Sequence, residues 1–154
     1  MAVLSQEQID QFWRDGAIVV PNAVTNEELT ALRTDFADWV EQSKSETGPF
    51  GAMSDGRPRF DVDPDHSSER PSLRRVASPE ELSEKYLAIA FDSRLADINA
   101  ELIGPNIRFH HAKVNSKLPN TKTVVKWHQD FPFDPHSNDD GITALLFVER
   151  PQHN

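Results

Sequence analysis

Apolar residues recur every three or four positions in four stretches of the chain, which is the spacing of one face of a helix. The first predicted helix lies between Ser5, which opens a capping box, and the stop signal Gly16. The second opens at Thr25 with another capping box and ends near "SKSETG". A third is predicted to begin at Ser78, and a fourth to span Asp92–Leu102. Residues 1–104 are therefore expected to be mainly helical.

Other stretches are rich in β-branched and aromatic residues without helical spacing, which predicts strands. These strand candidates are Ile18–Val20, Ile107–Lys117, Thr123–Asp130 and Ile142–Glu149. The stretch Gly48–Arg75 has no clear period and holds four prolines, so it is predicted to be a long loop. The expected fold class is α+β, with helices first and most strands in residues 105–154.

Composition narrows the class of protein. A length of 154 residues fits one domain, residues 1–154, and no apolar run approaches the roughly 20 residues of a membrane helix. The first residues, "MAVLSQEQIDQFWRDG", lack the basic and apolar regions of a signal peptide, and the absence of cysteine fits a reducing cytoplasm. A net charge of -9 disfavours nucleic acid and anionic membranes. We therefore expect a cytoplasmic protein that binds neither, and whose metal ligands, if any, are histidine or carboxylate.

The stretch "VVKWHQDFPFDPH" carries the clearest chemical signal. Side chains alternate along a strand, so His128 and Asp130 are predicted to point the same way. An imidazole nitrogen and a carboxylate oxygen suit a divalent metal such as Fe(II), and the pair is two thirds of a facial triad. The motif is also compatible with a surface histidine paired to an aspartate, or with a strand-end histidine that caps a loop.

Three longer stretches resemble one family. "SQEQIDQFWRDGAIVVPNAVTNEELTALR", "GPNIRFHHAKVNSKLP" and "WHQDFPF" follow each other in the order found in the phytanoyl-CoA dioxygenase family of Fe(II)- and 2-oxoglutarate-dependent oxygenases. The resemblance covers nearly the whole chain. It implies a double-stranded β-helix, a jelly-roll barrel with the iron at its mouth, preceded by helices. It also implies hydroxylation of a small organic substrate with release of succinate and CO2.

The resemblance assigns roles to particular residues. It implies that His128 and Asp130 are the first two iron ligands, and that Lys113 and Arg75 contact the cosubstrate 2-oxoglutarate. Ascorbate is the expected reductant in assays in vitro. Both basic residues have a plainer interpretation, since Lys113 is also typical of a solvated strand position and Arg75 of an ion pair with one of the 25 acidic residues.

The chain departs from the family pattern after Asp130. The family's third iron ligand and the arginine that binds 2-oxoglutarate lie several strands further on, and only His136 and His153 follow in this sequence. The chain is therefore expected to be an N-terminal half whose barrel is incomplete. Three interpretations remain open: a truncated or split product with a complementing C-terminal half, a barrel completed by self-association, and a non-catalytic relic that acts as a binding module.

Overall fold

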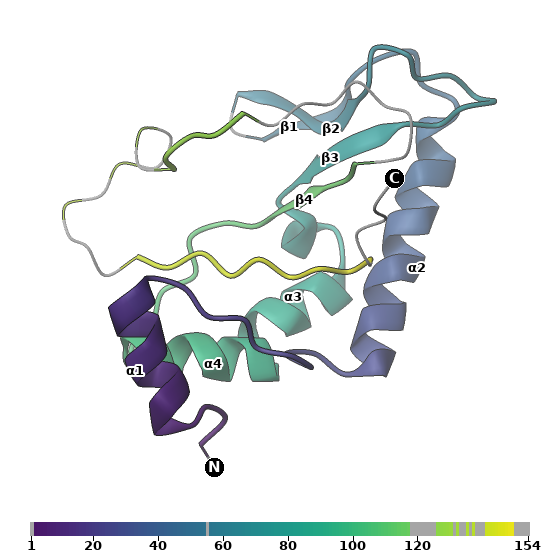
Figure 1. Ribbon diagram of the computed structural model, residues 1–154. Helices are drawn as coiled ribbons and strands as arrows, with labels where there is room; N and C mark the ends of the chain where they lie inside the picture. The colour runs from purple at the N-terminus through teal and green to yellow at the C-terminus, as the bar shows by residue number, and fades with distance from the viewer. Residues whose placement is uncertain are drawn as a thin grey trace.

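The computed structural model describes residues 2–54, 56–117, 126–130, 132, 135, 137 and 141–149. Within these residues the helices and strands follow each other as α1 (Gln6–Asp15), α2 (Asn26–Ser43), β1 (Phe50–Ser54), β2 (Arg57–Val62), β3 (Leu73–Ala77), the short 3-10 helix η1 (Pro79–Glu81), α3 (Glu84–Phe91), α4 (Arg94–Ile103) and β4 (Lys113–Asn115). The strands form an antiparallel sheet in the order β1-β2-β3-β4 (Figure 1). The α+β fold class predicted from the sequence is confirmed.

Helices α1 and α2 begin where the sequence places them, because both predicted capping boxes form. The Ser5 hydroxyl accepts from the Gln8 backbone N–H at 3.2 Å, and the Gln8 side chain accepts from the Ser5 N–H at 2.9 Å. Thr25 and Glu28 make the same reciprocal pair at the start of α2. Gly16 ends α1 with a φ of 77°, a left-handed conformation that glycine adopts without a steric penalty.

The third predicted helix begins later than expected. Ser78 adopts a left-handed conformation with φ 47°, and the turn that follows it is only the 3-10 helix η1. Helix α3 starts after Ser83, whose hydroxyl accepts from two backbone N–H groups of the first turn. The fourth helix is confirmed with a small shift: Ser93 caps α4, and Gly104 follows its last residue.

The sheet has one apolar face and one polar face. Phe60 pairs with Val76, and Val76 pairs with Val114, so these three apolar side chains share a face. Arg75 pairs with Asn115 on the other face. The register therefore separates a packed side of the sheet from a side that carries charge.

Helix α2 covers the apolar face of the sheet (Figure 1). Phe60, Val62, Leu73 and Val76 form the buried centre of this layer, and Leu73 and Val76 are completely buried. The partly buried residues that pack on them are Phe36, Trp39, Val40, Phe50 and Val114. Burial of such side chains is the main force that holds a helix on a sheet.

A second apolar cluster joins α1 to α4 at the other end of the molecule. Leu4, Ile98 and Leu102 are its buried members, and Ile142 packs against them from the segment 141–149. Figure 1 shows this segment running between the helices α1 and α4 on one side and the sheet on the other. The segment 141–149 therefore packs on the cluster that joins α1 to α4.

The predicted strands are largely wrong in position. Gly48–Arg75 is not a loop, because it contains β1, β2 and the start of β3, so three of the four strands precede residue 105. Ile18–Val20 forms no strand, and within Ile107–Lys117 only β4 does. The described residues 126–130 of Thr123–Asp130 pair with no strand, nor does Ile142–Glu149.

Pairing partners explain these errors. Residues 18–20 alternate between buried and exposed positions as a strand would, since Ile18 and Val20 pack on the second cluster and Val19 is exposed. Among the described residues, however, no strand pairs with them. In the supposed loop, Ser54 pairs with Arg57 across a two-residue connection whose second residue, Gly56, has a φ of 74°. An Asp-Gly pair at this place is a strong hairpin signal that outweighs the prolines nearby.

In the part of the chain that the structure describes, no helix is both long and apolar enough to cross a membrane.

Candidate metal centre

His128 and Asp130 converge in the structure as the sequence predicts. His128 Nε2 lies 3.3 Å from Asp130 Oδ1, although the segment 126–130 is not part of a strand. The other ring nitrogen, Nδ1, lies 2.8 Å from the backbone carbonyl oxygen of Lys126. A carbonyl oxygen only accepts, so Nδ1 carries the hydrogen and Nε2 is the nitrogen directed at the carboxylate.

This arrangement fits a divalent metal ion. Ligand bonds of about 2.1 Å at right angles place neighbouring donor atoms about 3 Å apart, close to the separation of Nε2 and Oδ1. A metal-bound histidine usually donates its second N–H to a carbonyl or carboxylate, as His128 does toward Lys126. The same geometry also fits an imidazolium–carboxylate ion pair, so both interpretations from the sequence remain open.

Within the described residues, no group of three histidine, aspartate or glutamate side chains is placed to hold a metal ion. His136 and His153, the later histidines of the sequence, lie outside the described residues. The described part of the chain therefore offers His128 and Asp130 as two candidate ligands.

A hollow of about 370 Å³ lies beside the pair. It is lined by His128 and Asp130 together with Lys117, Lys126 and Trp127, and the Trp127 side chain is wholly exposed. Neither lysine was singled out from the sequence. The signal that could have found Lys126 is its position two residues before His128, on the same side of the strand that was predicted there.

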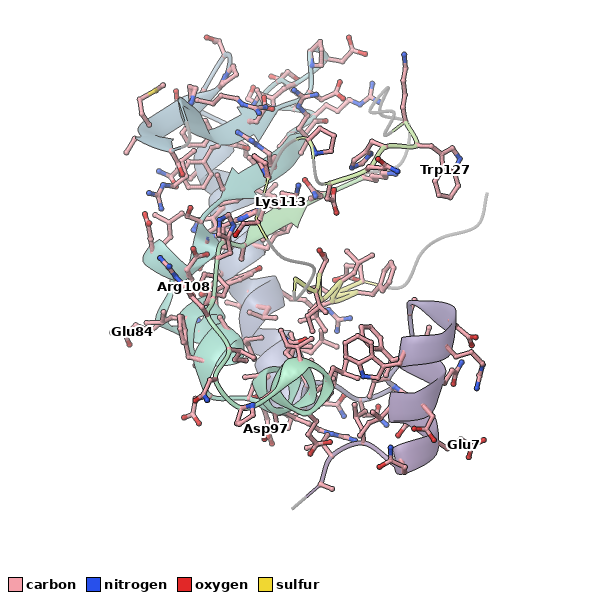
Figure 2. The ribbon with its side chains drawn as sticks, turned by 90° about the vertical axis from the view of Figure 1, so that its left-hand side faces the viewer. Glu7, Glu84, Asp97, Arg108, Lys113 and Trp127 are labelled. Carbon is pink, nitrogen blue, oxygen red and sulfur yellow. The ribbon has the colours of Figure 1, made fainter. Side chains whose placement is uncertain are left out.

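Lys113 and Arg75 lie together on the sheet rather than in the hollow. Lys113 pairs with Ala77 and Arg75 with Asn115, so both side chains belong to the polar face of neighbouring strands. Neither residue lines the hollow beside His128. Figure 2 shows Lys113 on the sheet and Trp127 on the separate segment that carries the metal pair.

Arg75 has unused hydrogen-bonding capacity. Its Nη2 donates to the Pro58 carbonyl oxygen at a long 3.5 Å, and its buried Nε has no hydrogen-bond partner in the described structure. Most buried donors are satisfied, but the buried Nε atoms of Arg59 and Arg74 also have no partner among the described residues, so three arginines of the sheet share this feature. A carboxylate is the group that a guanidinium binds best.

Other charges on the sheet are already paired. Arg74 donates to Asp61 at 2.7 Å, and Arg59 contacts Glu81 at 2.5 Å while its Nη1 donates to the Ser78 carbonyl oxygen. These contacts fix the η1 turn against the sheet. Arg57, Arg75 and the exposed Lys113 are basic residues of this face that form no ion pair with a described carboxylate.

Glu80 lies beside this network and is partly buried. Burial raises the pKa of Glu80, and the neighbouring Glu81 carboxylate raises it further, although Arg59 and His111 act in the opposite direction. One of its buried carboxylate oxygens has no hydrogen-bond partner in the described part of the chain. The raised pKa is consistent with a carboxyl that lacks enough donors.

Fold and site together define an α+β protein in which an antiparallel sheet carries a basic face and a separate segment presents a histidine–carboxylate pair of the kind that binds divalent metals. Residues 12–150 match the model of the phytanoyl-CoA dioxygenase family, PhyH, so the chain belongs to that family. The resemblance noted in the sequence is thereby confirmed.

Curated relatives share this similarity along most of the chain. A protein of Stutzerimonas stutzeri named "Probable alpha-ketoglutarate-dependent hypophosphite dioxygenase" is 27% identical over 143 residues, which are 93% of this chain and 47% of that protein. An ectoine dioxygenase of Stutzerimonas stutzeri strain A1501 is 25% identical over 160 residues, covering 99% of this chain and 48% of that protein. The ectoine dioxygenase of Halomonas elongata is 28% identical over 146 residues, covering 94% and 39%.

The chain spans about half the length, or less, of these relatives. No solved structure matches the chain at a significant level.

Proposed function

We propose that this chain forms part of an Fe(II)- and 2-oxoglutarate-dependent dioxygenase in which His128 and Asp130 hold the iron. The observation that carries the proposal is the 3.3 Å convergence of His128 Nε2 and Asp130 Oδ1, with Nδ1 directed at a backbone carbonyl. Iron bound there together with 2-oxoglutarate supplies the chemistry for hydroxylating a substrate with release of succinate and CO2. The protein residues fix two coordination positions and the tautomer of the imidazole.

Lys113 and Arg75 are proposed to bind the carboxylates of 2-oxoglutarate. Two facts support this role: both lie on the polar face of β3 and β4, and Arg75 has a buried Nε without a partner among the described residues. A carboxylate beside the guanidinium would satisfy that donor. Because neither residue lines the hollow at His128, the cosubstrate would have to extend between the sheet and the metal pair.

We propose that the four-stranded sheet is one part of a double-stranded β-helix within a single domain, and that further strands and a third iron ligand come from outside these 154 residues. Support comes from the length, about half that of the relatives, and from the exposed apolar side chains of Trp127, Leu145 and Phe147. Such side chains are typical of a surface that another element covers. The covering element would come from a continuation of the polypeptide, from a separate C-terminal half or from a second copy of the chain.

The substrate is proposed to be a small molecule. The relatives are named for hypophosphite and for ectoine, which makes these two compounds the first to test. A screen for 2-oxoglutarate-dependent succinate formation with each compound, using the protein together with a complementing half, would identify or exclude them.

Iron binding tests the metal site directly. Anaerobic titration with Fe(II) in a calorimeter is expected to detect binding to the unchanged chain. The affinity is expected to fall at least roughly tenfold in His128→Ala and in Asp130→Ala, because a site of few ligands loses much of its affinity with any one of them. The matched control is His110→Ala, which removes an exposed histidine outside the hollow. Equal affinity in all four proteins would refute the assignment.

A second candidate function is a binding module without catalysis. It is favoured by the ion-pair geometry of His128 and Asp130, which satisfies both groups without a metal. The two functions differ in their response to the cosubstrate. If 2-oxoglutarate leaves the Fe(II) affinity unchanged even with a complementing half present, the module is the better description; a clear increase in affinity favours the dioxygenase.

A further inference from the structure

Two lysines approach the candidate metal pair from different parts of the chain. Lys117 follows β4, and Lys126 lies two residues before His128, yet both line the hollow that contains His128 and Asp130. The Ser116 backbone N–H still donates to the Arg74 carbonyl oxygen at 2.8 Å, so the chain keeps following β3 up to the residue before Lys117. The sheet therefore fixes the backbone next to one of the two lysines.

The charge of the hollow opposes that of the molecule. The whole chain has 25 acidic and 16 basic residues, whereas the described residues that line the hollow include two lysines and one aspartate. Neither Lys117 nor Lys126 forms an ion pair with another described residue. Two like charges that converge on one small volume repel each other, and a bound anion would relieve that repulsion.

The hollow is separate from the basic residues of the sheet. Lys113 and Lys117 are four positions apart along an extended chain, which corresponds to about 13 Å. Lys113 and Arg75 do not line the hollow. The two pairs of basic residues can therefore bind two different anionic groups.

We propose that Lys117 and Lys126 bind a small oxyanion beside His128 and Asp130, and that they restrict the primary substrate to compounds that carry a carboxylate or a similar oxyanion. The inference rests on the proposed function, and it adds a substrate class and two specificity-determining residues to it. A volume of about 370 Å³ suits a small molecule. Lysine binds oxyanions as a compact point charge with three donors.

Anion binding can be measured without iron. The indole N–H signal of Trp127, assigned by its loss in Trp127→Phe, reports on the hollow during NMR titrations of the metal-free chain. Acetate and inorganic phosphate are expected to shift this signal saturably, whereas acetamide, which has the shape of acetate without its charge, is not. The double variant Lys117→Met/Lys126→Met is expected to raise the half-saturation concentration of acetate roughly fivefold or more, in line with the loss of two exposed charge contacts.

Lys44→Met is the matched control, because Lys44 pairs with Glu41 and does not line the hollow. The control is expected to bind acetate as the unchanged chain does. Equal shifts with acetate and acetamide, or an unchanged half-saturation concentration in the double variant, would overturn the proposal. Circular dichroism of each variant establishes that the fold is retained.

The cosubstrate is the competing source of the anion. If Lys117 and Lys126 serve the primary substrate, the double variant keeps its affinity for 2-oxoglutarate while Lys113→Met loses it, and saturating 2-oxoglutarate leaves acetate binding intact. If 2-oxoglutarate displaces acetate and the double variant loses 2-oxoglutarate binding, the lysines serve the cosubstrate and the substrate class is wrong. Loss of the Fe(II) site would be seen separately, since the acetate titration contains no metal.

Discussion

Asp35 joins helices α2 and α3, and removing its charge should measurably destabilise the fold. The Ser83 hydroxyl donates to one carboxylate oxygen of Asp35, and Lys85 Nζ lies 2.5 Å from the other. The Ser83 oxygen also caps α3, so one contact fixes both the helix and its position on α2. The substitution Asp35→Asn keeps the shape of the side chain and removes the charge.

The expected loss can be worked out from exposure. Lys85 is half exposed, so its ion pair contributes roughly 0.5–1 kcal/mol. The hydrogen bond from the buried Ser83 changes from a charged acceptor to a neutral one, a loss of about 1 kcal/mol. Asp35→Asn should therefore lower the free energy of unfolding by about 1.5–2 kcal/mol, which is roughly 3–8 °C in Tm for a domain of this size.

The effect should depend on pH in a defined direction. Burial acts to raise the pKa of Asp35, but the hydrogen bonds from Lys85 and Ser83 and the Lys85 charge outweigh it, so the pKa is lowered from its ordinary value of 3.8. A carboxyl with a lowered pKa stabilises the fold above its unfolded-state pKa, and the stabilisation is lost as the pH falls through the folded-state pKa. The difference between Asp35→Asn and the unchanged chain should be constant from pH 5 to 7 and shrink below pH 3.8.

Urea denaturation followed by circular dichroism measures these differences. Asp38→Asn is the matched control, because Asp38 is exposed on the same helix three positions later. Lys85→Met and the double variant complete a cycle that isolates the ion pair. If Asp35→Asn costs no more than Asp38→Asn, or if its cost does not fall at low pH, the reasoning from burial and hydrogen bonds is wrong.

Three further substitutions test other parts of the structure. Glu101→Gln should speed hydrogen exchange of the Val3 and Leu4 amides, which donate to this carboxylate. The same hydrogen bonds lower the pKa of Glu101 from 4.5. In thermal unfolding, the stability that they contribute is therefore expected to be lost progressively as the pH falls below 4.5. His66→Ala should cost about 1–3 kcal/mol in urea unfolding, because its Nε2 donates to the Ser43 carbonyl oxygen and its Nδ1 accepts from the Ser72 N–H, each at 2.8 Å. Leu73→Ala should cost about 2–5 kcal/mol, since Leu73 is fully buried under α2, and a loss below 1 kcal/mol would contradict that packing.

The helices could be predicted because their signals are local. The capping boxes at Ser5 and Thr25 and the stop at Gly16 depend on residues within one or two turns, and all are present in the structure. The start of α3 was misplaced because Ser78 and Ser83 are both plausible caps. Only the left-handed conformation of Ser78 and the contact of Ser83 with Asp35 decide between them.

The strands could not be located in the same way, because pairing joins residues that are distant in sequence. The β1–β2 hairpin was overlooked because of the prolines and polar residues around it, although its Asp-Gly pair is a local hairpin signal. It is held by the stacking of Phe50 on Phe60, with ring centroids 4.6 Å apart. Gly51 lies so close to Phe60 that a Cβ would come within 2.8 Å of the ring, which explains why glycine stands there. The contact of Phe60 with Phe50 and Gly51 cannot be predicted from the neighbouring sequence.

In the candidate site, too, some features could be predicted from neighbouring residues and others depend on residues that are distant in sequence. The convergence of His128 and Asp130 was predicted from the alternation of side chains along a strand. The two side chains do meet in the structure, although the segment 126–130 is not part of a strand. Lys117 and Lys126 line the same hollow although they are nine positions apart, and no local pattern predicts that placement. Lys113 and Arg75 stay predictions as cosubstrate residues, although the strand register that places them on one face was not foreseen.

The anchor between Arg33 and the segment 141–149 has a consequence for folding. Arg33 donates to the Val148 carbonyl oxygen and pairs with Glu149, across a sequence separation of 115 residues to Val148. At about 5–20 residues per second, a ribosome needs roughly 6–23 s to make the chain between these partners. During synthesis, helix α2 therefore lacks the contacts of Arg33 with Val148 and Glu149 until the ribosome has made that segment. Contacts between residues this distant in sequence are also slow to form in refolding. During that interval the cluster of Leu4, Ile98 and Leu102 also lacks Ile142, and its uncovered apolar surface is open to chaperones and to other unfinished chains.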